Sequence, residues 1–248
     1  MDYKENFIFI DDYYRKNDNQ KDISIVIFSP FYPFNNRFVY TLFSKTKFKD
    51  SKFIFSNIET LNGSKNFAYN FINIMDVYCK AIEKINCNDI TLVAFGIFTN
   101  IFIQIANIFK ERINRFILFE PDFSNNALFK MNEGANFIFS NLKSILNFYL
   151  EEKSKIDKNF ISKNYSKYLK KIFESIRDLS DNNKKLLKEL VDNKIETVIF
   201  WKIMEKELWP LPQILVEDYG IKAFSLKNNI YKIFIEEDND IINILNNI

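Results

Sequence analysis

Short runs of β-branched and aromatic residues, each bounded by polar turns, recur along the chain and predict β-strands. Seven such runs are Phe7–Ile10, Ile23–Phe28, Lys52–Phe55, Ile90–Ala94, Arg115–Phe119, Glu196–Trp201 and Lys222–Leu226. Several are apolar at consecutive positions, as expected of strands that are covered on both faces. The pattern therefore favours a mainly parallel sheet between two layers of helices.

Amphipathic segments with apolar residues three and four positions apart lie between many of these strands and predict helices. They are Asn36–Lys45, Asn66–Ile85, Thr99–Lys110 and Asp238–Ile248. Strands that alternate with helices along the chain are typical of a doubly wound α/β domain. The predicted fold class is therefore α/β, with a mostly parallel, doubly wound sheet.

The alternation stops between residues 123 and 194, where helical patterns follow one another without a strand. Helices are expected over Ala135–Glu152, Asp157–Leu179 and Asp181–Lys194. The charged residues of this segment are interpreted as a solvated face. We expect one domain whose core is formed by residues 1–122 and 195–248, with residues 123–194 as a helical insertion.

Composition narrows the chemistry, because the 248-residue chain contains no histidine. Its absence excludes Ser-His-Asp and Cys-His catalysis, a histidine general base and the common histidine-bearing zinc sites. The 34 basic side chains nearly balance the 32 acidic ones, so no basic face for nucleic acid is expected. Two cysteines, Cys79 and Cys87, are interpreted as buried or half-buried thiols. We predict neither a metal site nor a cofactor.

The distribution of apolar and charged residues also bears on the cellular location of the protein. The first residues, MDYKENFIFIDDYY, carry acidic groups on both sides of a short apolar run, unlike a signal peptide. No stretch approaches the length of about 18 apolar residues that indicates a membrane span. We therefore expect a soluble, cytoplasmic protein. The abundance of Ile, Asn, Phe and Lys is attributed to an AT-rich source genome.

Six local sequences, in this order and spacing, resemble those of the α/β-hydrolase fold superfamily. They are Ser24–Pro33, Phe55–Ser64, Ile82–Asn100, Ile105–Pro121, Thr197–Pro210 and Phe234–Ile248. The first looks like the strand that ends in the family's His-Gly oxyanion-hole loop. The third falls where the family carries its G-x-S-x-G nucleophile elbow. The resemblance implies a hydrolase-type sheet, with the helical insertion as its cap.

The family's catalytic residues are missing at the matching positions. The nucleophile position falls on Gly96, and the His-Gly loop is replaced by Ser29-Pro30. The position of the acid falls on Glu205 or Glu207, and that of the histidine on Asn229 or Ile230. Glycine tolerates the positive φ of an elbow but brings no nucleophile. The resemblance therefore implies a divergent member that lacks the catalytic triad.

Other residues near the expected carboxyl edge of the sheet offer alternative chemistry. Glu120 and Asp122 directly follow a strand, where a carboxylate can act as nucleophile or base. The favoured interpretation is structural, namely that they cap the insertion or pair with lysines on its helices. A Ser29–Lys202 dyad is a further alternative, but the family template gives no reason to expect the two to be in contact. The Thr99 hydroxyl is another, although hydroxyls in the first turn of a helix normally bond the backbone.

Aromatic residues gather around the expected mouth of the sheet, as either a ligand pocket or a collapsed former active site. They are Phe31, Tyr32, Phe34, Phe95, Phe98, Trp201, Trp209 and Tyr231. Backbone N–H groups of Phe31 and Ile97 could retain an oxyanion hole. The predicted binding residues are Phe31, Ile97, Phe98, Trp201 and Tyr231.

Three hypotheses of function follow. The leading one is a pseudoenzyme that binds an apolar small molecule or a protein partner. The second is a hydrolase of carboxylic esters or thioesters that works through a non-standard site. The third is an assembly protein that dimerises through exposed aromatic residues of the cap.

Overall fold

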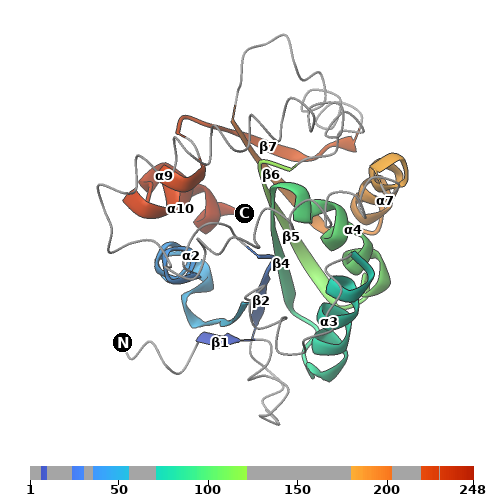
Figure 1. The fold of residues 1–248 in the computed structure, drawn as a ribbon. Coiled ribbons are helices and arrows are strands. Elements are labelled where there is room, and N and C mark those ends of the chain that lie inside the picture. Colours follow the sequence, from blue (N-terminus) through green and yellow to red (C-terminus); the bar gives the residue numbers. More distant parts are fainter. Residues whose placement is uncertain are drawn as a thin grey trace, which may run out of the picture.

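A seven-stranded sheet forms the centre of the molecule (Figure 1). The computed structural model describes residues 7–9, 24–30, 36–55, 71–121, 180–202, 219–228 and 230–248. The strands are β1 (Phe7–Phe9), β2 (Ile25–Phe28), β3 (Lys52–Phe55), β4 (Ile90–Phe95), β5 (Ile113–Phe119), β6 (Glu196–Lys202) and β7 (Lys222–Leu226). Their order is β1-β3-β2-β4-β5-β6-β7, and every neighbouring pair is parallel.

Helices cover both faces of this sheet. They are α2 (Asn36–Phe43), α3 (Phe71–Lys84), α4 (Thr99–Ile108), α7 (Ser180–Asp192), α9 (Ile230–Glu236) and α10 (Asn239–Asn247). Figure 1 shows α3, α4 and α7 on one side of the sheet, and α2, α9 and α10 on the other. The predicted α/β class and the parallel, doubly wound sheet are confirmed.

Several boundaries differ from the predicted ones for local reasons. After α2, a 3-10 turn, η1 (Lys47–Asp50), begins where the Thr46 hydroxyl accepts a hydrogen bond from the Phe48 N–H. Strand β4 runs one residue further than expected, and β5 begins two residues earlier. Helix α9 was not expected, because it has only seven residues. The predicted helices 135–152 and 157–179 lie outside the described residues.

The face toward α3, α4 and α7 is packed mainly by aliphatic side chains. Successive side chains of a strand point to opposite faces, so each strand sends every second residue into this layer. Fully buried strand residues here include Ile27, Ile54, Leu92, Leu118 and Ile199. Burial of such side chains stabilises the fold by roughly 1.5–3 kcal/mol each.

The opposite face carries a row of phenylalanines that crosses four strands. Phe95 is the register partner of Phe119, Phe119 that of Phe200, and Phe200 that of Phe224. Their rings stack with centroids 5.5, 4.6 and 5.7 Å apart. Phe234 of α9 meets Phe95 and Phe119 edge-on. Since such pairs stabilise by about 0.5–1.5 kcal/mol beyond burial, the row fixes the sheet against α9.

Helix α7 is joined to α4 by a chain of buried amides. Asn183 is fully buried and donates to Asn100 Oδ1 at 2.6 Å, while its own Oδ1 accepts from Gln104 at 2.7 Å. Leu187 and Leu190 of the same helix are buried in the core. This helix lies in the segment expected as a cap, yet it packs as a layer of the α/β core. The division of the chain into core and cap stays a prediction.

Arg112 ties the end of α3 to the start of β4 and β5. Its guanidinium donates to the carbonyl of Ile82 at 2.9 Å, to that of Cys87 at 3.0 Å and also to that of Ile85. Helix-terminal carbonyls have no partner within the helix, so a cation that donates hydrogen bonds to them stabilises the helix end. The residue falls in the Ile105–Pro121 segment on which the resemblance rests.

Candidate functional site

Gly96 forms the sharp turn that follows β4. It has φ +51° and opens the 3-10 turn η3 (Gly96–Phe98), which leads directly into α4. Residues other than glycine rarely adopt this left-handed backbone conformation. A Cβ placed on Gly96 would meet no atom within 4 Å among its surroundings in the described structure. The turn thus has the shape of an elbow, with open space where a side chain would project.

Ser29 fixes the neighbouring strand end to this turn. The residue is buried, its N–H donates to the carbonyl of Val93 at 2.8 Å, and its Oγ accepts the N–H of Phe95 at 3.0 Å. The hydroxyl therefore continues the ladder between β2 and β4 after the backbone pairing ends. Tyr78 of α3 adds a hydrogen bond of 3.0 Å from its hydroxyl to the carbonyl of Phe28. Ser29 is thus a structural hydrogen-bonding group of the elbow.

The Ser29–Lys202 pair considered above does not form. Ser29 follows β2 and Lys202 ends β6, and strands β4 and β5 lie between these two in the sheet. Strands in a sheet are about 4.8 Å apart, which separates the two positions by roughly 14 Å. The resemblance gave no reason to expect this contact, and the strand order agrees with that expectation.

Glu120 lies beside Gly96 at the carboxyl edge of the sheet. The residues before them, Phe119 and Phe95, are register partners on adjacent strands. Glu120 has φ +45°, and its N–H donates to the carbonyl of Phe200 at 2.7 Å. One carboxylate oxygen, Oε1, is buried. A non-glycine residue in this conformation is strained, and such strain concentrates at functional sites.

Two residues just after the elbow are buried in the core. Phe98 is 4% exposed and packs with the aliphatic layer between the sheet and α3 and α4. Thr99, the first residue of α4, is fully buried, and its Oγ1 has no hydrogen-bond partner within the described structure. It shares a helix face with Phe102 and Ile103, three and four positions further on. A hydroxyl in this place is out of reach of a substrate in solution.

Of the other predicted site residues, Trp201 and Ile230 have described side chains. Trp201 lies on β6, partly buried against the aliphatic layer. Ile230, one of the two positions matched to the histidine, begins α9 and is buried beside the phenylalanine row. For Ile97, Lys202 and Tyr231 the structure describes the backbone alone. Phe31, Asp122, Glu205, Glu207 and Asn229 lie outside the described residues.

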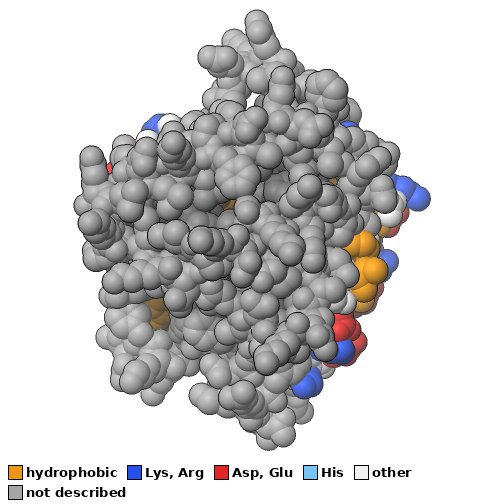
Figure 2. Space-filling view, in the orientation of Figure 1, with side chains coloured by type: hydrophobic (Ala, Val, Ile, Leu, Met, Phe, Trp, Pro, Cys, Tyr) orange, Lys and Arg blue, Asp and Glu red, His pale blue; other side chains and the backbone are white. Residues whose placement is uncertain are grey.

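Other features of the described residues do not point to a second reactive site. Burial, together with Glu83 and Asp76, raises the pKa of the half-buried Cys79 to about 11, which makes its thiolate scarce at neutral pH. Within the described ranges, no three Cys, Asp or Glu side chains gather as a metal site, and no helix is both long and apolar enough to cross a bilayer. Figure 2 shows a small apolar area on the side of α3, α4 and α7, and Ile72 and Ile108 are exposed on α3 and α4.

Solved structures resemble this chain over most of its length. MGS-M2, an α/β-hydrolase enzyme from a Medee basin deep-sea metagenome library, matches with a TM-score of 0.59 at 11% identity, over 93% of this chain and 90% of that one. A carboxylesterase structure from the thaumarchaeon Nitrososphaera gargenis matches with a TM-score of 0.55 at 13% identity, over 91% and 89%. This chain has an α/β-hydrolase fold. An epoxide hydrolase from Bacillus megaterium matches with a TM-score of 0.51 at 14% identity, over 91% and 94%.

The likeness is one of structure and not of sequence. No protein-family model matches the chain, and no curated protein matches it either. At these identities the α/β-hydrolase fold is shown, while substrates and activities remain those of the proteins named. The expectation from local sequence resemblance is thus confirmed at the level of the fold.

The sequence indicated the position of the elbow but not the hydrogen bond that fixes it to the neighbouring strand. The positive φ of Gly96 agrees with its assigned place, since glycine is the residue that adopts it most easily. The Ser29 hydroxyl was considered as a nucleophile, whereas in the structure it accepts a hydrogen bond from a backbone N–H. Its partner Phe95 is 66 residues away, and no local pattern signals such a contact.

Proposed function

We propose that this α/β-hydrolase-fold protein is a non-catalytic binding protein. The observation that carries the proposal is Gly96, which has the backbone of an elbow and no side chain to attack a substrate. The sequence contains no histidine to serve as the base. The Ser29 hydroxyl is engaged with Phe95, and that of Thr99 is buried. Each hydroxyl near the elbow in the described structure thus has a reason not to act as nucleophile.

A small apolar molecule is the proposed ligand. Among the described residues no atom lies within 4 Å of a Cβ placed on Gly96, and parallel α/β sheets bind ligands at the carboxyl edge of their strands. Removing the nucleophile's side chain leaves room for a ligand group at the position where chemistry would otherwise occur. A protein partner in place of the small molecule would bind without filling this space.

The absence of catalysis is tested with a fluorophosphonate probe and a panel of p-nitrophenyl esters. We expect no specific labelling and no turnover above that of heat-denatured protein, with a serine esterase as the positive control. Labelling of the folded protein at a single residue, or saturable turnover, would contradict the proposal.

Ligand binding is tested with the apolar dye 8-anilinonaphthalene-1-sulfonate. The Gly96→Phe variant fills the space at the elbow and is expected to weaken dye binding, because the aromatic ring occupies the site. Gly220→Phe is the matched control, since Gly220 also has a positive φ (+66°) and an open Cβ position. Both variants carry similar backbone strain, so equal loss of dye binding in the two would exclude a site at Gly96. Thermal melts confirm that each variant is folded.

A second candidate function is ester hydrolysis through Glu120. The observation in its favour is the strained, left-handed Glu120 directly beside the space at Gly96. A carboxylate in this position could activate water for attack on an acyl group. If turnover is found, Glu120→Gln should abolish it, whereas Glu111→Gln, the same change at an exposed turn, should not. Unchanged turnover in Glu120→Gln would rule out this candidate.

A further inference from the structure

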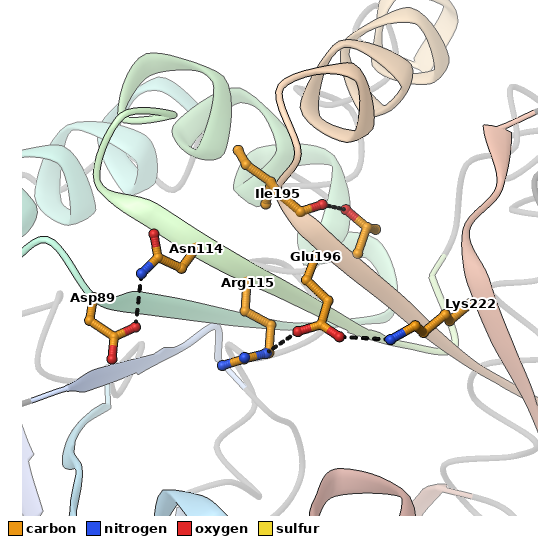
Figure 3. Close-up of polar contacts among 7 residues, drawn as sticks. Asp89, Asn114, Arg115, Ile195, Glu196 and Lys222 are labelled. Carbon is orange, nitrogen blue, oxygen red and sulfur yellow. Dashed lines mark hydrogen bonds and ion pairs between the residues drawn. The ribbon is translucent and has the colours of Figure 1, made fainter. Parts of the chain in front are cut away.

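A cluster of charged residues lies at the amino-terminal edge of the sheet, at the end of the strands opposite to Gly96. Arg115 and Glu196 are register partners near the starts of β5 and β6, and Lys222 begins β7. One carboxylate oxygen of Glu196 accepts a hydrogen bond from Arg115 Nε at 2.9 Å, and the other accepts one from Lys222 Nζ at 2.8 Å (Figure 3). One carboxylate thus holds two cations in place on neighbouring strands.

Lys47 of η1 brings a third cation to this cluster. Its Nζ lies 5.6 Å from the centroid of the Phe48 ring, and the Arg115 guanidinium lies 5.5 Å from the same centroid. The Phe48 ring is buried, so it anchors both cations from the protein side. Within the described residues no carboxylate is within ion-pair distance of Lys47.

The cluster keeps hydrogen-bond donors that its own residues do not use. Of the Arg115 guanidinium, Nε alone donates to Glu196, and in Figure 3 the rest of the group extends away from that carboxylate. The two Nη atoms donate to no other residue of the described structure. A guanidinium has five N–H donors in a planar fork, so four remain for an oxyanion. The nearby carboxylate of Asp89 receives the amide of Asn114 at 3.1 Å.

The charge balance of the cluster is positive. Burial and the neighbouring Arg115 lower the pKa of Lys47, which shows that cations oppose one another there. Burial works against ionisation of Glu196, but hydrogen bonds from Lys222 and Arg115 lower its pKa overall, so it is ionised at neutral pH. With Lys47, Arg115 and Lys222 opposed by Glu196 and Asp89, one positive charge is in excess.

We propose that Arg115 and Lys47, which lie over the same Phe48 ring, form a binding site for a phosphate group, separate from the elbow at Gly96. A phosphate dianion presents several acceptor oxygens and matches the free guanidinium donors of Arg115 together with the Lys47 ammonium group better than a single carboxylate does. Lys222, on the other side of Glu196, adds positive charge to the cluster. Glu196 acts as the group that holds Arg115 and Lys222 in register. The site is independent of the function proposed for the elbow, because the two lie at opposite ends of the strands.

The test titrates the full chain with inorganic phosphate at constant ionic strength and follows the Arg115 Nε–Hε signal by NMR. We expect a saturable shift of this signal in the wild type. Lys47→Met should weaken phosphate binding by roughly fivefold, the effect of one partly exposed charged donor. Lys184→Met is the matched control, since Lys184 is exposed on α7, at the other face of the sheet, and it should bind as the wild type does.

Two further arms identify the source of the phosphate group. Glucose 6-phosphate represents soluble phosphate esters, and phosphatidylcholine vesicles with phosphatidic acid represent lipid headgroups. Lys47-dependent binding to either one supports the site and assigns its source. The proposal is overturned if phosphate causes no saturable shift, or if Lys47→Met and Lys184→Met weaken binding equally, since binding would then reflect net charge alone.

Discussion

Gly96 and Glu120 directly follow the paired ends of adjacent strands, and both have a left-handed backbone conformation. The phenylalanines that precede them stack on the face of the sheet that α9 covers. Both strands therefore end at the same level and turn sharply away from the sheet. This arrangement places an open position and a strained carboxylate next to each other at the carboxyl edge.

Gly96→Ser should fold and should remain inactive toward p-nitrophenyl esters. The new Cβ has room, but the left-handed backbone should lower the free energy of unfolding by about 1–2 kcal/mol. A serine without a base has no means to become a nucleophile. Chemical denaturation and an ester assay measure the two effects. Gly220→Ser carries similar strain, so a much larger loss in Gly96→Ser would show that the space is not open.

Ser29→Ala should destabilise the protein by about 1–3 kcal/mol, because it removes the buried acceptor of the Phe95 N–H. The measurement is urea denaturation followed by circular dichroism. Ser225→Ala, the same change at an exposed position of β7, serves as the control and should be nearly neutral. Equal stability of Ser29→Ala and the wild type would contradict the role of this hydroxyl in the elbow.

Arg112→Met should lower the free energy of unfolding by about 1.5–3 kcal/mol. The methionine keeps much of the apolar stem but donates nothing to the carbonyls of Ile82, Ile85 and Cys87. Lys110→Met, two residues earlier and exposed, controls for the loss of one positive charge. A similar small effect in both variants would mean that water satisfies these carbonyls equally well.

Glu196 should make the stability of the protein depend on pH in the acidic range. Its pKa is lowered in the folded state from an ordinary value of 4.5, so its contribution is present above that value. The contribution is lost as the pH falls through the folded-state pKa. The difference in unfolding free energy between wild type and Glu196→Gln should therefore shrink from pH 7 to pH 3. A difference that is constant over this range would exclude the ion pairs as its source.

The strands were predictable because their apolar runs are local properties of the sequence. Ile90–Ala94, for example, was assigned from its β-branched and apolar residues, and the observed β4 differs by one residue. Phe98 was expected at the mouth of the sheet, whereas the structure places it in the aliphatic layer. Helix α9 was not predicted, because its residue Phe234 packs on phenylalanines that come together only in the assembled sheet.

The sequence by itself determined the order of strands and helices, the absence of histidine and the glycine at the elbow, since each is a matter of local pattern or composition. Tertiary structure alone decided which groups meet. The register of parallel strands brings Phe95 to Phe119, Arg115 to Glu196 and Gly96 beside Glu120. It also gives the Ser29 hydroxyl to the Phe95 N–H. These contacts join residues far apart in the chain, where spacing along the sequence carries no information about distance in space.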